Sequence, residues 1–357
     1  MTHPASAQII PPGPDEPLDI TFNQDVLTQL YTAFAQYGDA FRVYSPDTKA
    51  HIYVFNHPDH VRRLLVDNHQ NYTKGIGIER VGILLGKGLM VSEGELWRRQ
   101  RRMIQPAFHR EIIASMIEHI RAANLQLLDK WVKCADNQQE VNVTQDMSDV
   151  TLNIVLRSIF GDDLETIITS HGSNPFALLT DETERNLAFA YKFRALSKII
   201  TDCVTRRSAN GEQRYDLLAM LMAARDRKSG EPMPDKQLLD EVMTLIVAGH
   251  ETTASALNWF WYLLSQHPDV ESQMHEEIDR LSAIPETLEG IAQLTYTRQV
   301  IEETLRLYPP GWLLTRRAIG SDEISGYAIA PNTDVFISPY IAKCSPMQAR
   351  GPSAKGR

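Results

Sequence analysis

The chain has 357 residues, of which 43% are hydrophobic and 23% are charged, a balance typical of globular proteins with a large buried core. Its formal net charge of -9 argues against nucleic acid as a main partner. Three unevenly spaced cysteines form neither a disulfide framework nor a zinc pattern, and without an 18-residue apolar run or a signal sequence we expect a cytoplasmic protein with no membrane anchor.

The N-terminal half is expected to be mainly helical. Its first 20 residues are proline-rich and are interpreted as a flexible lead-in. Two strands are predicted over 40–45 and 51–55 from their β-branched and aromatic content. Residues 68–89 and 162–180 are interpreted as loops. Helical apolar periods predict helices over 22–36, from Pro58, from Trp97, and over 110–135, 143–160, 181–207 and 216–225.

The longest predicted helix runs from Pro234 to Pro268, with about 30 residues free of internal proline and a length of roughly 45 Å. Because apolar residues occupy nearly all of its faces, we expect it to be buried in the middle of a large domain. Two helices (269–281, 296–308) and two strands (313–318, 335–339) follow. The fold class is therefore mainly α with a small β-sheet region (α+β), the sheet being split between the two ends of the chain.

The centre of this helix, Ala248 to Thr253, places a carboxylate and two hydroxyls among apolar residues. Burying such groups is costly unless they are hydrogen-bonded or functional. Gly249 costs the helix about 1 kcal/mol relative to alanine, and it allows a close approach to the backbone. Two interpretations stay open: a kinked core helix whose threonines bond back to the preceding turn, or an acid–alcohol pair beside a bound cofactor. A His-Glu-x-x-His zinc helix is excluded because residue 254 is alanine.

Three further motifs each have a simple explanation and a functional one. Trp97 and Arg101 lie one turn apart on the basic helix, where they could bind one carboxylate or simply form a solvated charged face. Glu303 and Arg306 are spaced i,i+3, and their apolar neighbours suggest a packed ion pair. Arg316 lies in a predicted strand, where an edge charge is the simpler explanation.

Together these residues resemble the cytochrome P-450 family of haem-thiolate monooxygenases, in order from about residue 20 to Ala342. The Ala248–Thr253 segment resembles the family's long central helix motif, and Glu303-x-x-Arg306 resembles its Glu-x-x-Arg motif. Trp97-x-x-x-Arg101 is similar to the helix that contacts the haem propionates, and Arg316 holds the place of a second propionate contact. The resemblance implies a cytochrome P-450-like fold with haem (iron protoporphyrin) as its cofactor.

The resemblance also implies roles for individual residues. Thr252 is expected to face the bound oxygen and Glu251 to relay protons from solvent, with Ala248 and Gly249 beside the cofactor. Glu303 and Arg306 are expected to be structural. The implied reaction is hydroxylation or epoxidation of a small apolar substrate with dioxygen. Electrons would come from a separate ferredoxin or flavoprotein, and the basic helix after Trp97 is one candidate docking face.

One departure from the family is large. The family's haem ligand is a cysteine in a Phe-x-x-Gly-x-Arg-x-Cys-x-Gly loop, and this sequence has no such loop, so no metal ligand is assigned. After Ala342 the composition turns basic and the apolar period disappears. We therefore expect residues 21–342 to be a partial P-450 domain, truncated before that loop, and 343–357 to be a disordered tail foreign to the family. The alternative function is an inactive fragment without the haem-ligating cysteine.

Overall fold

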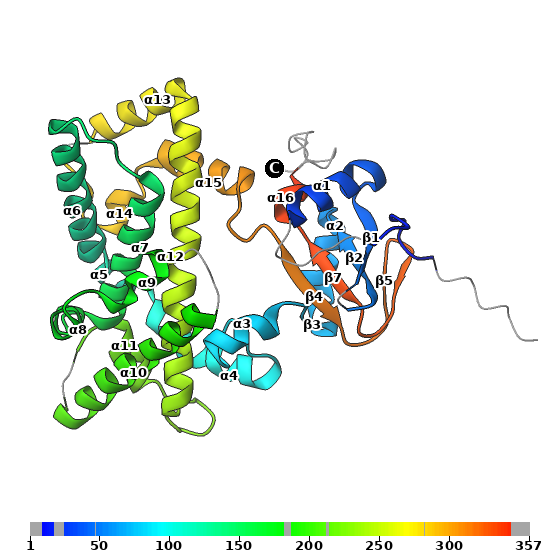
Figure 1. Cartoon of the computed structure of the whole chain (residues 1–357), viewed down its shortest axis with the longest axis horizontal. Helices are drawn as coiled ribbons and strands as arrows, with labels where there is room; N and C mark the ends of the chain where they lie inside the picture. The colour runs from blue at the N-terminus through cyan, green and yellow to red at the C-terminus, as the bar shows by residue number, and fades with distance from the viewer. Residues whose placement is uncertain are drawn as a thin grey trace, which may run out of the picture. The chain divides into compact units, whose positions relative to one another are not determined.

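The computed structural model describes residues 9–17, 25–46, 48–181, 187–211, 214–281 and 283–343. The chain divides into two compact units (Figure 1). The sheet unit comprises residues 1–79 and 305–357, and the helical unit comprises residues 80–304. A mainly helical chain with a small sheet is thus confirmed, while the partial P-450 domain expected over 21–342 stays a prediction.

The sheet unit joins strands from both ends of the chain, as predicted. β2 (Ala50–Phe55) pairs antiparallel with β1 (Ala40–Ser45) and parallel with β7 (Asp334–Ile337). The five-stranded sheet has the order β1-β2-β7-β4-β3, with β3 at Tyr72–Lys74 and β4 at Leu314–Ala318. β5 (Asp322–Ile324) and β6 (Tyr327–Ile329) form a separate hairpin. The other elements of this unit are α1 (Val26–Tyr37), α2 (Pro58–Arg62), the π-helix Arg63–Asp67, the short 3₁₀ turn His69–Asn71 and α16 (Pro339–Ala342).

The central strands of this sheet are buried on both faces. Ile52, Val54 and Phe336 pack with α1 residues such as Leu30 on one face, and Phe55, Val335 and Ile337 form a second apolar cluster on the other. This two-sided burial explains why β2 and β7 have continuous apolar runs rather than an alternating pattern. α1 ends at Gly38, whose φ of 82° is a conformation that favours glycine.

Part of the expected flexible lead-in is bound to the sheet unit. The Ile9 carbonyl accepts a hydrogen bond from the Ala328 N–H (2.9 Å), and the Pro12 carbonyl accepts one from the Arg42 N–H (2.8 Å). These two backbone hydrogen bonds therefore hold the segment 9–17 against the sheet unit. The rest of the lead-in up to residue 20, and the tail apart from Lys343, lie outside the described residues.

The helical unit contains two helices in segments that were interpreted as loops. Both α3 (Ile78–Leu85) and α8 (Asp163–His171) place apolar residues in the main core, among them Leu85, Leu164 and Ile167. Tertiary packing therefore outweighs the glycine and polar residues of these segments. The unit's other helices are α4 (Gly94–Ile104), α5 (Arg110–Ser115), α6 (Ile117–Asp136), α7 (Val143–Phe160), α9 (Leu178–Asp181), α10 (Leu187–Asn210), α11 (Leu217–Ala223), α12 (Asp235–Gln266), α13 (Pro268–Asp279), α14 (Leu288–Ile291) and α15 (Thr295–Leu307), with 3₁₀ turns at Gln105–Phe108 and Pro175–Ala177.

The long predicted helix is α12, a continuous α-helix of 32 residues that packs along α7 (Figure 1). Its N-terminal half is buried through residues such as Val242 and Ile246. Its middle and C-terminal parts are buried at residues such as Ala254 and Leu264, but Thr252, Trp259 and Tyr262 are exposed. The expectation of burial on all sides is wrong for this structure, because α7 and its neighbours cover one side of the helix in the helical unit.

The N-terminus of α15, the helix that carries Glu303, is capped by a carboxylate from α13. Glu277 accepts hydrogen bonds from the N–H groups of Tyr296 (2.7 Å) and Thr297 (2.9 Å) and from the Thr297 hydroxyl (2.8 Å). Desolvation acts to raise the pKa of Glu277, but these bonds outweigh it and lower the pKa from 4.5 to about 2. The cap therefore depends on an ionised carboxylate.

This cap predicts a pH dependence for α15. Because the folded pKa lies below the unfolded one, Glu277 contributes stability above pH 4.5 and loses it as the pH falls toward about 2. Glu277→Gln should remove this part of the acid-induced loss of protection in α15, measured by amide hydrogen exchange. Glu276→Gln is the matched control, since Glu276 is exposed and pairs only within its own helix with Arg280. Identical acid profiles for the Glu277 variant and the parent would contradict the proposed cap.

Candidate functional site

The acid–alcohol segment of α12 has a hydrogen-bonding pattern that only the structure could establish. The Thr252 hydroxyl donates to the Ala248 carbonyl at 2.9 Å, and the Thr253 hydroxyl donates to the Gly249 carbonyl at 3.2 Å. Both threonines therefore bond back to the preceding turn, as in the first interpretation of this segment. The side chains of Glu251 and Thr252 are nevertheless exposed, so a molecule outside the helix can reach them.

Gly249 allows a close approach by a neighbouring helix. A Cβ atom at this position would lie 2.9 Å from Cγ2 of Val155 on α7, closer than real Cβ contacts come. The missing side chain therefore lets α7 and α12 pack together. The roles predicted for Ala248 and Gly249 beside a cofactor remain predictions.

The basic helix α4 presents Trp97 and Arg101 as exposed side chains one turn apart. Two of its other arginines are engaged within the unit: Arg98 pairs with Glu95, and Arg99 pairs with Asp226 at 2.8 Å. Among the described residues, Arg101 has no hydrogen-bond or ion-pair partner. The helix is therefore not a uniform basic face, and Arg101 is an exposed cation on it that can bind an anion.

An apolar cavity of about 180 Å³ lies between α3, α9, α10 and α12. Seven apolar side chains line it, including Val81, Phe189, Phe193 and Val247, and its one charged lining residue is Glu251. Sequence reasoning identified Glu251 but missed the cavity. The signal available was the apolar run at 81–85, which had been assigned to a loop.

The remaining predicted site residues, Arg316, Glu303 and Arg306, lie on β4 and α15. Arg316 lies on β4 of the sheet unit, where its Nη1 donates to the Thr315 carbonyl at 2.8 Å. Glu303 and Arg306 lie on α15, and both side chains are exposed while Thr304 between them is buried. The packed ion pair expected for Glu303 and Arg306 stays a prediction, because the border between the two units falls between these residues.

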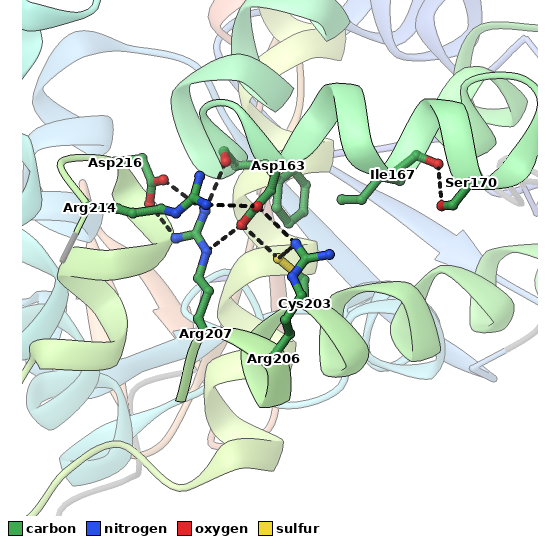
Figure 2. Close-up of polar contacts among 9 residues, drawn as sticks. Asp163, Ile167, Ser170, Cys203, Arg206, Arg207, Arg214 and Asp216 are labelled. Atoms are coloured by element: carbon green, nitrogen blue, oxygen red, sulfur yellow. Dashed lines mark hydrogen bonds and ion pairs between the residues drawn. The ribbon is translucent and has the colours of Figure 1, made fainter. Parts of the chain in front are cut away.

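A buried polar network, which sequence reasoning missed, joins four helices of the helical unit. Figure 2 shows Arg207 of α10 between Asp163 of α8 and Asp216 at the start of α11. Its guanidinium also donates to the Phe160 carbonyl at the end of α7, at 2.8 Å. The side chains of Arg207, Asp163 and Asp216 are 2%, 5% and 7% exposed. The network ties these helix ends together and has a structural role.

Cys203 belongs to the same network and does not suit the role of an iron ligand. Its thiol donates to Oδ2 of Asp163 at 3.4 Å (Figure 2). Burial, helped by the negative charge of Asp163, raises the pKa of the thiol to about 11, so it is protonated at neutral pH. The other described cysteine, Cys134, lies on α6, away from the segment around Thr252 in the sequence.

The family model described as Cytochrome P450 matches residues 18–174 and 175–347, which is nearly the whole chain. The chain belongs to the cytochrome P450 family. Protein LUTEIN DEFICIENT 5, chloroplastic, from Arabidopsis thaliana is 30% identical over 91% of this chain. Cyclooctatin synthase from Streptomyces melanosporofaciens is 31% identical over 83% of it. The chain spans 59% and 67% of the lengths of these two relatives.

The fold agrees with this family. A solved cytochrome P450 (CYP102L1) superposes with a TM-score of 0.80 at 23% sequence identity, covering 93% of this chain and 79% of that one. The predicted cytochrome P450-like fold is therefore confirmed. Within the described part of the chain, no helix has both the length and the apolar character needed to cross a membrane.

The cofactor of cytochrome P450 proteins is haem, and part of the helical unit fits it. Arg101, exposed beside Trp97 and without a partner among the described residues, suits a propionate. Glu251 and Thr252 are both exposed on α12, and their roles beside the cofactor stay predictions.

Proposed function

We propose that this chain carries the oxygen-activating and substrate-binding part of a haem-dependent monooxygenase, which hydroxylates or epoxidises a small apolar molecule with dioxygen. The supporting observation is the apolar cavity, because its one charged lining residue is Glu251, the neighbour of Thr252. Bound haem supplies the activation of dioxygen. The protein's own residues bind and orient the substrate, exclude water and move protons.

The cavity favours a terpenoid substrate. Its volume of about 180 Å³ is close to the roughly 150 Å³ of a dry cavity that holds one benzene ring, so it can hold one ring or a branched segment. Its seven apolar lining residues offer no specific hydrogen bonds along most of the wall. The names of two relatives refer to lutein and cyclooctatin, both terpenoids. We therefore propose a hydrocarbon-rich isoprenoid substrate.

The site residues divide into proton transfer and cofactor binding. Thr252 would hold a proton at Oγ1, and the exposed carboxylate of Glu251 would exchange it with solvent. Ala248 and Gly249 would border the cofactor. Trp97 and Arg101 would bind one propionate, and Arg316 the other.

We propose an external ferredoxin or flavoprotein as electron donor and the cytoplasm as the compartment. The candidate docking face on α4 offers fewer available positive charges than its sequence suggests. Arg98 already pairs with Glu95, and Arg99 already pairs with Asp226. A docking partner would therefore recognise the exposed end of α4 through fewer cations than the sequence shows.

Replacing Thr252 with alanine should test the proton-transfer role in haem-loaded protein supplied with an electron donor. Product formed per electron should fall, by roughly 10²-fold if Thr252 acts as a proton-transfer group, and peroxide release should rise. Substrate binding should change little, because Thr252 does not line the cavity. Thr253→Ala is the matched control, because the Thr253 hydroxyl donates to the Gly249 carbonyl just as the Thr252 hydroxyl donates to the Ala248 carbonyl. Unchanged coupling in Thr252→Ala would contradict the role.

The alternative is an inactive chain, and one observation favours it: the thiol of Cys203 is buried, hydrogen-bonded to Asp163 and protonated. Titration of the purified chain with haemin, followed by its absorbance and by tryptophan quenching, distinguishes the two. The proposed function predicts saturable binding that Arg101→Ala weakens and Arg98→Ala, which removes an arginine already paired with Glu95, does not. Absence of saturable binding would favour the inactive fragment.

A further inference from the structure

The turn between α3 and α4 is held by two carboxylates from α12. The N–H of Lys87 donates to Oδ2 of Asp240 at 2.9 Å, and the N–H of Leu89 donates to Oε2 of Glu241 at 2.8 Å. The side chain of Glu241 is fully buried and Asp240 is nearly so. A backbone N–H that donates to a buried carboxyl oxygen fixes both the distance and the angle of the contact, so the turn is held in one orientation.

Only glycine fits at the two ends of this turn. A Cβ at Gly86 would lie 2.3 Å from Oδ1 of Asp240, and one at Gly88 would lie 2.1 Å from Oγ1 of Thr244. Gly86 also has a φ of +60°, which side-chain-bearing residues rarely adopt. The Gly-x-Gly pattern therefore lets the backbone lie directly against α12.

The same turn is joined to α4 from the other side. Nε2 of Gln100 donates to the Lys87 carbonyl at 2.7 Å, and the Gln100 side chain is fully buried. Gln100 lies between Trp97 and Arg101 in the sequence of α4. The turn thus forms a continuous hydrogen-bonded link from Glu241 and Asp240 to the helix that carries the candidate propionate ligands.

We propose that Asp240, Glu241 and Gln100 are positioning residues, which set α4 against α12 and thereby place Trp97 and Arg101 for the cofactor's propionates. This inference rests on the proposed function for its cofactor. The carboxylates act through the backbone of the turn, because they accept hydrogen bonds from the N–H groups of Lys87 and Leu89. Loss of Glu241 should leave α12 helical but free the start of α4 to shift.

Amide hydrogen exchange of the full chain tests whether the turn sets the position of α4 against α12. Glu241→Ala should speed exchange over residues 86–101, while Glu241→Gln should restore protection because its amide oxygen can accept the same bond. Ile246→Ala is the matched control, a truncation of a fully buried α12 residue that makes none of the hydrogen bonds to the turn. The proposal is overturned if both alanine variants change residues 86–101 equally, or if Glu241→Ala leaves them unchanged.

Haemin titration of the same variants tests whether this position of α4 supports cofactor binding. Glu241→Ala should weaken affinity by roughly 10-fold, in the range seen when a supporting group behind a ligand is removed, and Glu241→Gln should recover most of it. In a double-mutant cycle with Arg101→Ala the two losses should be less than additive, because both act on one contact. Additive losses would overturn the proposal. If the parent chain binds no haemin, the proposed function fails, and so does the inferred effect on cofactor binding. The exchange data still decide whether the turn positions α4.

Discussion

Replacing Arg207 with methionine should lower the free energy of unfolding of the helical unit by about 3–5 kcal/mol. The guanidinium donates to Asp163 at 2.6 Å and to both oxygens of Asp216 at 2.7 and 2.8 Å, where little water can reach. Without it, two buried carboxylates lose their most buried cationic partner, although Asp163 keeps the more exposed Arg206 and Arg214. Urea denaturation followed by circular dichroism measures the loss.

Arg206→Met is the matched control for this prediction. Arg206 is the adjacent residue and pairs with the same Asp163 at 2.8 Å, but its side chain is 40% exposed. An exposed ion pair of this kind contributes about 0–1 kcal/mol. Burial, rather than the presence of an ion pair, should therefore decide the effect. Equal losses in the two variants would show that the network is as weak as a surface pair.

Replacing Phe336 with alanine should cost the sheet unit about 3–5 kcal/mol, the usual range for a fully buried aromatic residue. Phe336 lies on β7, the strand that joins the N-terminal and C-terminal parts of the sheet, and is 1% exposed. The loss should appear as faster amide exchange in β1 and β2. Strands of the same unit should respond together, because β7 pairs directly with β2.

Phe108→Ala provides the comparison, since Phe108 is 44% exposed and should change stability by no more than about 0.5 kcal/mol. Exchange in α7 and α12 should stay close to the parent in the Phe336 variant, because these helices belong to the other unit. Simultaneous loss of protection in both units would contradict the prediction that the loss is confined to the sheet unit.

Local sequence pattern was sufficient for the elements whose signals are local. The strand 40–45, the start of a helix at Pro58 and the long helix ending before Pro268 all follow from β-branched runs, proline positions and capping residues. The family was also within reach, because its motifs are short, ordered along the chain and made of distinctive residues. The roles predicted for Glu251, Thr252, Trp97 and Arg101 stay predictions.

Contacts between distant segments decided the rest. α3 and α8 are helical because their apolar residues fill the core beside helices far away in the sequence, which no local propensity reports. The neighbour of Gly249 is Val155, and the partners of Arg207 lie on α8 and at the start of α11. The exposure of Glu251 and Thr252 in an apolar helix likewise depends on which side of α12 its neighbours cover. Burial and pairing are properties of the packed chain, so residue type and spacing limit them without determining them.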